Sequence, residues 1–345
     1  MLKFSQKTPA QTSQSMKKSS LNPEKKEKLH ITTVESLIRR SESRFLSTKE
    51  IIILTIGSVL YFSWFYFLMG LRIEHTILYF FLLSLYFTHS KTRKFLWAFG
   101  VYVVYWVMYD SLRIIPNHTV NTLHIADLYN FEKSIFGIFT EGGVLTPNEY
   151  AKLHHTPFFD VVAAFFYVNW VPIPLIFSFY LFLKNKPLFL TFSYTFFFVN
   201  ILGFVIYYAY PAAPPWYIEQ YGFQGQLNVP SSAAGLLNFD KLFGVTFFQD
   251  LYQKNSNVFA AMPSMHSAFP VICFLCGLQL KKPWLNVLFG TFAIGIWFSA
   301  IYTRHHYISD VVVGASLACI GYYWFRHLSE KPKVKTYFDY LLTKF

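Results

Sequence analysis

Long apolar runs separated by short polar segments fill the chain from residue 51 onward. The eight runs cover residues 51–71, 76–87, 95–110, 158–183, 188–210, 267–280, 284–302 and 308–325. A helix needs about 20 mainly apolar residues to cross the hydrocarbon core of a bilayer. The pattern therefore predicts an all-α fold, a polytopic membrane helical bundle of about eight spans.

Two segments between these runs are too polar to cross a bilayer. Residues 111–157 mix charged, glycine and apolar positions, and we expect an interfacial helix followed by a loop. Residues 211–262 open with Pro211, Pro214 and Pro215. Proline cannot continue a helix, so this opening predicts a rigid turn at the membrane interface.

The ends of the chain divide it into three predicted regions. Residues 1–48 are polar and rich in lysine, serine, threonine and glutamine, which is typical of a disordered basic cytoplasmic tail. Residues 49–327 form the predicted membrane catalytic domain, and residues 328–345 a second cytoplasmic tail. No apolar run precedes Ile51, so we expect no cleavable signal peptide.

The composition and charge distribution also indicate a membrane protein. Hydrophobic residues make up 54% of the chain and charged residues only 14%. The formal net charge is +12, with basic residues in the tails and in short loops at 91–94, 184–186 and 281–282. Eight spans would put these loops and both termini on one side, which the positive-inside rule assigns to the cytoplasm. The charge thus indicates topology rather than nucleic-acid binding, and the opposite, periplasmic or lumenal side receives the two polar segments.

Cysteines and one asparagine motif bear on covalent modification. Cys273, Cys276 and Cys319 lie in apolar runs without neighbouring histidines, so we interpret them as packing residues rather than metal ligands or a disulfide. Asn117-His118-Thr119 matches the acceptor motif for N-glycosylation. Glycosylation at Asn117 is therefore left open for a eukaryotic source.

Two histidine motifs stand at the ends of the predicted hairpin 267–302. Because its two arms cross the membrane and return, His266 and His306 reach the same face. His306 and Asp310 are four residues apart at a helix start and share a helix face. A carboxylate beside an imidazole fixes its tautomer and stabilises its cation. His306 is therefore a candidate nucleophile, and a simple polar pair at a helix end is the alternative.

The residues before His266 are typical of a helix N-terminus. Pro263 and Ser264 fit the first positions of a helix. Free backbone N–H groups there favour anions, so we expect phosphate near Ser264 and His266 beside it as general acid. The alternative is a capping serine next to an interfacial histidine.

Arg304 and His305 precede the candidate nucleophile directly. The guanidinium of Arg304 suits a phosphate, and the alternative is a rim cation or a counter-ion to Asp310. His305 is five residues from Asp310 and lies off its face. We therefore expect His305 to contact a head group rather than to act as the nucleophile.

The two motifs together resemble the type 2 phosphatidic acid phosphatase superfamily. Pro263-Ser264-Met265-His266 is similar to its Pro-Ser-Gly-His motif, and His306-x3-Asp310 to the end of its Ser-Arg-x5-His-x3-Asp motif. The resemblance spans residues 95–325 and implies a six-helix phosphatase-type core. It also implies that His306 becomes phosphohistidine, that Asp310 orients it, and that His266 protonates the leaving alcohol.

The chain departs from the superfamily pattern at three places. Met265 replaces the motif glycine, and Ala300 replaces the arginine six residues before the nucleophile, where Arg304 is expected to substitute. The Lys-x6-Arg-Pro motif has no clean counterpart. An ester phosphate carries less charge than a monoester and needs fewer cations, so these departures favour transfer between lipids over hydrolysis.

Further segments are similar to the branch that includes fungal inositol phosphorylceramide synthase. They are the block 207–217, which contains Trp216, and Thr-Arg-His-His-Tyr-x-x-Asp at 303–310. That branch also tends to carry an arginine and a glutamate where this chain has Arg113 and Glu132. The resemblance gives a substrate- or phosphate-binding set of Arg304, Ser264, His305, Arg113 and Trp216.

The expected function is that of a membrane lipid phosphotransferase in sphingolipid metabolism. A phosphoinositol-type head group would pass from a phospholipid donor to a ceramide-like alcohol through a phosphohistidine, with no metal and no cofactor. An accessory subunit is left open. The first alternative is a lipid phosphate phosphatase acting on phosphatidic acid or an isoprenyl diphosphate. The second is a transporter, for which Asn169 and Asn200 are the few polar residues in mid-span.

Overall fold

The computed structural model describes residues 47–253 and 257–344. The predicted amino-terminal tail therefore lies almost wholly outside the described residues. The chain divides into two compact units, Met1–Phe67 and Leu68–Phe345. In the first unit, α2 (Thr48–Trp64) begins at Ser47, which caps the helix reciprocally with Glu50.

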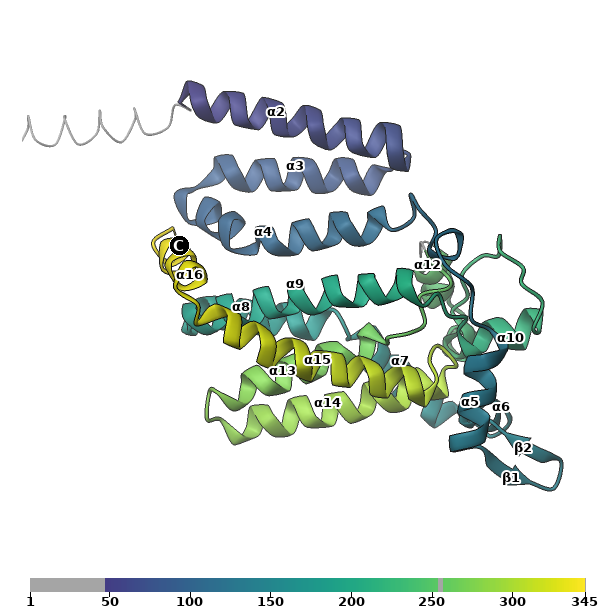
Figure 1. The fold of residues 1–345 in the computed structure, drawn as a ribbon. Coiled ribbons are helices and arrows are strands. Elements are labelled where there is room, and N and C mark those ends of the chain that lie inside the picture. The colour runs from purple at the N-terminus through teal and green to yellow at the C-terminus, as the bar shows by residue number, and fades with distance from the viewer. Residues whose placement is uncertain (1–46, 254–256, 345) are drawn as a thin grey trace, which may run out of the picture. The chain divides into compact units, whose positions relative to one another are not determined.

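The described chain beyond α2 is almost entirely helical (Figure 1). Its elements are η1 (Phe65–Met69), α3 (Ile73–Thr88), α4 (Ser90–Ser111), η2 (Asn117–Thr119), α5 (Ala126–Phe136), β1 (Ile138–Thr140), β2 (Gly143–Leu145), α6 (Pro147–Leu153), α7 (Pro157–Val168), α8 (Pro172–Lys184), α9 (Lys186–Ala209), α10 (Pro215–Tyr221), η3 (Ala234–Leu236), α11 (Leu237–Phe243), α12 (Phe247–Gln253), α13 (Met265–Leu278), α14 (Pro283–Tyr302), α15 (Ile308–Ser329) and α16 (Pro332–Leu342). The strands β1 and β2 form one short antiparallel hairpin. The all-α prediction is confirmed.

All eight predicted apolar runs are helical, but they differ in how well they fit a bilayer. Within residues 47–253 and 257–344, four helices are long and apolar enough to cross: α2 with η1, α9, α14 and α15. The pair α7 and α8 adds a fifth if it counts as one span. Helices α3 and α13 are shorter, with 16 and 14 residues, and α4 carries charged residues at both ends. For these three helices, spanning stays a prediction.

The run 158–183, predicted as one span, is broken in the structure. Helix α7 ends at Val168, α8 begins at Pro172, and the two are bent by 42°. Pro172 and Pro174 have no N–H to donate to the last carbonyls of α7, so the helix cannot continue through them. The break leaves Trp170 in the connecting turn, where it reaches the site described below.

The helices that carry the histidine motifs pack closely together. Helix α13 packs against α14, α15 and α9, which run side by side (Figure 1). The hydroxyl of Ser267 lies 2.7 Å from the carbonyl of Ser264 and 3.0 Å from that of Val311. A Cβ added to Gly314 would lie 2.1 Å from the carbonyl oxygen of Ser264. Glycine therefore allows the start of α15 to touch the start of α13.

We expect Gly314→Ala to lower the thermal stability of the protein. The added methyl group must displace the backbone of Ser264, and such overpacking costs about 1–3 kcal/mol. The measurement is the unfolding midpoint of purified protein in detergent. Gly100→Ala in α4 is the matched control, because no atom lies within 4 Å of its added Cβ. Equal midpoints for the two variants would contradict the close approach of α13 and α15.

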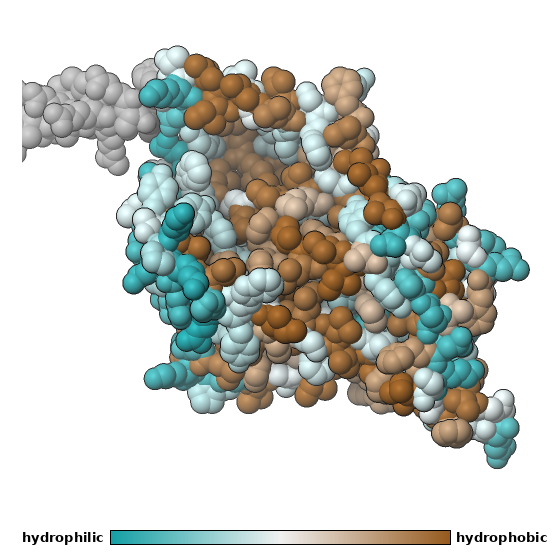
Figure 2. All heavy atoms as spheres, in the orientation of Figure 1, coloured by the Kyte–Doolittle hydropathy of each residue, from teal (hydrophilic) through white to brown (hydrophobic). Residues whose placement is uncertain are grey.

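The surface has the distribution of a membrane protein. Figure 2 shows apolar side chains gathered over the middle of the helices and hydrophilic ones at their two ends. Large apolar side chains such as Phe179, Val205, Val287, Ile294 and Ile320 are exposed on the helices. A soluble protein rarely exposes so much apolar surface, and we conclude that the chain is an integral membrane protein.

The segment 111–157 is more structured than the predicted interfacial helix and loop. It forms η2, α5, the β1–β2 hairpin and α6. Asn117 is fully buried, and its side-chain amide donates to the carbonyls of Tyr207 at 2.8 Å and Phe259 at 2.7 Å. Both amide hydrogens are thus used inside the protein. Asn117 is therefore not available for glycosylation in the folded chain.

The cysteines agree with the packing interpretation. Cys273, Cys276 and Cys319 form no disulfide, and the first two are buried in the core of the helical bundle. Small apolar side chains suit such positions.

Candidate active site

Two backbone segments bring the histidine motifs together. His266 is the second residue of α13, which Ser264 caps by accepting a hydrogen bond from the N–H of Ser267 at 3.3 Å. His306 lies in the loop 303–307 between α14 and α15. The N–H of Ser264 donates to the carbonyl of Asp310 at 3.0 Å. The two motifs are therefore joined through the main chain as well as through their side chains.

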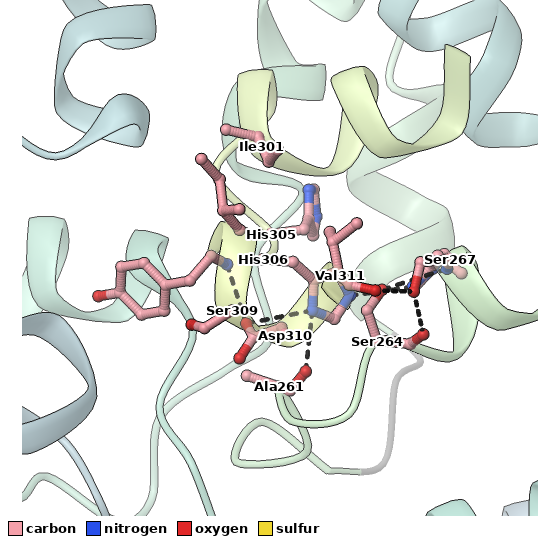
Figure 3. A network of polar contacts seen from close by, with 12 residues as sticks. Ala261, Ser264, Ser267, Ile301, His305, His306, Ser309, Asp310 and Val311 are labelled. Atoms are coloured by element: carbon pink, nitrogen blue, oxygen red, sulfur yellow. Dashed lines mark hydrogen bonds and ion pairs between the residues drawn. The ribbon is translucent and has the colours of Figure 1, made fainter. Parts of the chain in front are cut away.

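The ring of His306 is held at one nitrogen and faces His266 with the other. Its Nδ1 lies 2.9 Å from the carbonyl oxygen of Ala261 and 3.5 Å from Oδ2 of Asp310 (Figure 3). Its Nε2 lies 3.0 Å from Nδ1 of His266. Two acceptors beside Nδ1 assign the proton of the neutral ring to that atom. The lone pair of Nε2 then faces His266.

Asp310 is completely buried at the start of α15. Its Oδ2 accepts a hydrogen bond from the N–H of Tyr307 at 2.9 Å, which caps the helix. At 3.5 Å from Nδ1 of His306, the carboxylate acts mainly as an electrostatic partner. The carbonyl of Ala261 makes the shorter hydrogen bond to that ring.

Aromatic rings hold His266. The ring of Tyr167 stacks on it with centroids 4.5 Å apart and planes 15° apart. Trp170, from the turn between α7 and α8, lies 4.2 Å from it by the same measure. These two ring contacts restrict the imidazole, whose Nδ1 lies 3.0 Å from Nε2 of His306.

A cavity of about 630 Å³ includes both histidine rings in its wall. That volume lies within the usual range for small-molecule sites. Of the predicted substrate-binding residues, Trp216, Arg113 and His305 line it. Ser264 and Arg304 are not part of its wall, so the structure brings together only some of the predicted set.

Arg304 forms an ion pair with Glu219 outside this cavity. Its Nε lies 2.7 Å from Oε2 of Glu219, and both line a separate pocket of about 200 Å³. Its carbonyl accepts a hydrogen bond from the N–H of Trp216 at 3.0 Å, and its φ of 64° lies in the left-handed region. These contacts support a structural role for Arg304 in shaping the loop before His306. Phosphate binding by Arg304 stays a prediction that these contacts do not support.

His305 occupies a different environment from His306, and the two rings point in different directions (Figure 3). Its Nδ1 lies 2.9 Å from Oγ1 of Thr303, and its ring lies between Tyr167 and Tyr252 at centroid distances of 5.0 and 4.7 Å. Burial lowers the pKa of His305. The ring is therefore neutral at pH 7, which suits a contact residue rather than an acid.

Glu132 holds the first turn of α15 from the outer segment. The side chain is completely buried. One carboxylate oxygen accepts from the N–H of Ile308 at 2.7 Å, and the other from the N–H and hydroxyl of Ser309 at 3.2 and 3.0 Å. Burial raises the pKa of Glu132, and these donors act in the opposite direction. The carboxylate thus fixes the helix that carries Asp310.

Asn148 supports the same loop and was not identified from the sequence. Its amide donates to the carbonyl of Ile301 at 2.8 Å and to that of His306 at 2.9 Å. The capping pattern of Thr146 and Glu149 predicts a helix start at this point. No local pattern reveals partners more than a hundred residues away, so only the folded chain shows this contact.

We expect Glu132→Ala to destabilise the protein and reduce its activity together. Two backbone N–H groups would lose their acceptor in a buried place, which costs roughly 1–3 kcal/mol for each group left unsatisfied. The measurements are the unfolding midpoint and the catalytic rate in detergent. Glu141→Ala, at an exposed glutamate of the β1–β2 hairpin, is the matched control. If the two variants behaved alike, Glu132 would not be supporting the site.

Comparison with known proteins identifies the family. The sequence profile of the PAP2 superfamily matches residues 145–324, which include His266, His306 and Asp310. The chain belongs to the PAP2 superfamily. The superfamily predicted from the two histidine motifs is thus confirmed. No solved structure matches the chain.

Several relatives of this PAP2 protein carry similar names. The phosphoinositol dihydroceramide synthase of Bacteroides thetaiotaomicron is 43% identical over 273 residues, covering 78% of this chain and 90% of that protein. The inositol phosphorylceramide synthase catalytic subunit aur1 of Schizosaccharomyces pombe is 28% identical over 264 residues, covering 74% and 59%. The inositol phosphorylceramide synthase of Candida albicans is 35% identical over 151 residues, covering 42% and 31%.

Proposed function

We propose that the protein transfers phosphoinositol from a phospholipid to the primary hydroxyl of a ceramide-type lipid, through a phosphohistidine on His306. The observation that carries the proposal is the pair of rings 3.0 Å apart, with Nδ1 of His306 occupied and Nε2 directed at His266. The names of the relatives, above all the phosphoinositol dihydroceramide synthase, support the choice of donor and acceptor.

In the first step, the donor phosphate displaces the hydrogen bond between the two rings, so that phosphorus lies against Nε2 of His306 and the leaving oxygen lies against His266. Nε2 of His306 attacks phosphorus, the N–P bond forms, and the P–O bond to diacylglycerol breaks. Protonated His266 gives its proton to the leaving oxygen. Nδ1 of His306 keeps its proton and continues to donate to the carbonyl of Ala261. The positive charge that develops on the ring therefore faces the buried carboxylate of Asp310.

In the second step, the same two rings act in reverse. Neutral His266 removes the proton of the acceptor hydroxyl, the oxygen attacks phosphorus, and the N–P bond to His306 breaks. His266 ends protonated and His306 neutral, ready for the next donor. Because both leaving group and acceptor are alcohols, one acid–base residue serves both steps. The largely apolar wall around the histidines disfavours water, which supports transfer over hydrolysis.

We further propose that the site opens to the periplasmic or lumenal side and that both termini are cytoplasmic. The basic residues of the 91–94, 184–186 and 281–282 loops support this orientation. A membrane-impermeant thiol reagent applied to sealed cells should label Glu141→Cys but not Lys281→Cys. The reverse pattern would invert the topology without affecting the proposed chemistry.

The decisive assay uses purified protein in detergent with phosphatidylinositol labelled in its inositol. We expect labelled product only when ceramide or dihydroceramide is added. Release of water-soluble inositol phosphate at a rate that is the same with and without the acceptor would instead identify a hydrolase. Failure to use phosphatidylinositol with either acceptor would refute the proposed donor.

A further inference from the structure

A polar cluster at the start of α3 and the end of α4 shares the cavity of the histidines but has no part in the two steps above. Asp110 accepts from Arg72 at 2.6 Å, from Arg113 at 2.5 Å and from Nε2 of His75 at 3.0 Å. We call Arg72, His75, Asp110 and Arg113 the α3–α4 cluster. His75 and Asp110 are buried, whereas the side chains of the two arginines are 31% and 26% exposed and line the cavity.

Two parts of the chain line the cavity, one inside and one outside the segment that matches the superfamily. His266, His306 and Trp216 lie within residues 145–324, the part of the chain that matches the superfamily. Arg72, Asp110 and Arg113 line the same cavity but precede that part. The catalytic histidines therefore lie in the part of the chain that matches the superfamily, whereas this polar wall of the cavity lies outside it. A wall of this kind is suited to selecting the group that is transferred.

The balance of donors and acceptors in this wall points to a polyol. The guanidinium groups of Arg72 and Arg113 and the carboxylates of Asp110 and Glu74 line the cavity together. A second phosphate would accept only and would be repelled by the carboxylates. A sugar-like hydroxyl donates and accepts at once, so it pairs with both kinds of group.

Asn200 on α9 gives an independent sign of a binding site. It is 1% exposed and lines the cavity, and its amide N–H donates to the carbonyl of Phe196 at 2.8 Å. Its Oδ1 is buried without a hydrogen-bond partner. A buried acceptor without a donor costs free energy, and the hydroxyl of a bound polyol would supply the donor.

We propose that the α3–α4 cluster and Asn200 bind the polyol of the donor head group and so determine which head group is transferred. This assignment rests on the proposed function, because it deepens the identity of the donor. The histidines carry out the transfer, and the cluster discriminates among phosphodiesters by their hydroxyl groups.

The first test measures binding without turnover. Wild-type protein in detergent is titrated calorimetrically with glycerophosphoinositol and with glycerophosphocholine, two soluble phosphodiesters that differ in the head group. We expect the inositol compound to bind at least roughly tenfold more tightly, the effect of one or two hydrogen bonds to charged groups. Asp110→Asn should remove that preference. Asp127→Asn, at an exposed aspartate paired with His124, is the matched control and should keep it.

Asn200→Leu separates recognition from stability. Leucine lacks the acceptor Oδ1, which has no hydrogen-bond partner in the protein. If Asn200 had only a structural role, the preference for glycerophosphoinositol would therefore remain unchanged. We expect an unfolding midpoint equal to or above that of the wild type, together with a several-fold weaker binding of glycerophosphoinositol. This variant also covers the case in which Asp110→Asn fails to fold.

The outcomes separate the two proposals. Equal wild-type affinity for the two phosphodiesters, or an unchanged preference in Asp110→Asn and Asn200→Leu, would overturn the assignment even if transfer to ceramide occurs. Conversely, inositol-selective binding that depends on these residues would support it even if the acceptor proved to be a lipid other than ceramide.

Discussion

Replacement of His306 by alanine should abolish head-group transfer, lowering the turnover rate by roughly 10⁴-fold or more, as the loss of a covalent nucleophile does. The imidazole is the group whose Nε2 faces His266, while Nδ1 contacts the carbonyl of Ala261 and the carboxylate of Asp310. Wild-type protein incubated with donor labelled at phosphorus, without acceptor, should become labelled in an acid-labile, alkali-stable form. His306→Ala should remain unlabelled.

The matched control for this experiment is His154→Ala. His154 is an exposed histidine that stacks on Tyr150 at the end of α6 and lies outside the cavity wall. Its loss should leave turnover within about twofold of the wild type, since surface substitutions have small effects. If His306→Ala kept substantial activity while folding normally, the covalent mechanism would be wrong. If His305→Ala alone abolished labelling, the nucleophile would be the neighbouring residue.

The parts of the site that the sequence could predict are those encoded locally. The capping pattern at Ser264 depends only on helix geometry. The four-residue spacing of His306 and Asp310 also placed the two side chains together, although His306 lies in the loop before α15 and not on its face as predicted. The apolar run on each side of Lys281 and Lys282 fixes a hairpin, and a hairpin returns both of its ends to one face. These local rules were enough to bring His266 and His306 together.

The parts that escaped prediction depend on contacts between distant segments. Arg304 is two residues from His306 in sequence, yet its left-handed backbone and its partner Glu219 place it outside the cavity wall. Proximity along the chain is therefore a poor guide where a loop reverses. The contacts of Glu132 and Asn148 with this loop likewise join segments that no periodicity relates.

The fold shows the same division. The long apolar runs located all eight helical segments, but the hydropathy of a run does not show where proline lacks the N–H that a continuous helix needs. Pro172 therefore broke the run 158–183 where the pattern predicted one span. That break matters for function, because it leaves Trp170 free to pack on His266.

His266→Gln should reduce transfer from phosphatidylinositol by roughly 10²–10⁴-fold, the usual contribution of a general acid–base residue. Glutamine keeps much of the volume between Tyr167 and Trp170 but cannot exchange protons near neutral pH. The same variant should react almost normally in the first step with a nitrophenyl ester of inositol phosphate, because nitrophenolate leaves without protonation. The second step would still lack its base.

Without a base for the second step, the labelled phosphohistidine should persist. With a nitrophenyl donor labelled at phosphorus and ceramide present, His266→Gln should accumulate label on His306, whereas wild-type protein should pass it on and the double variant with His306→Ala should take up none. Nitrophenol release measures the first step and labelled lipid the second. Equal losses with both donors would mean that His266 acts by positioning the substrate rather than by moving protons, because only proton transfer depends on the basicity of the leaving group.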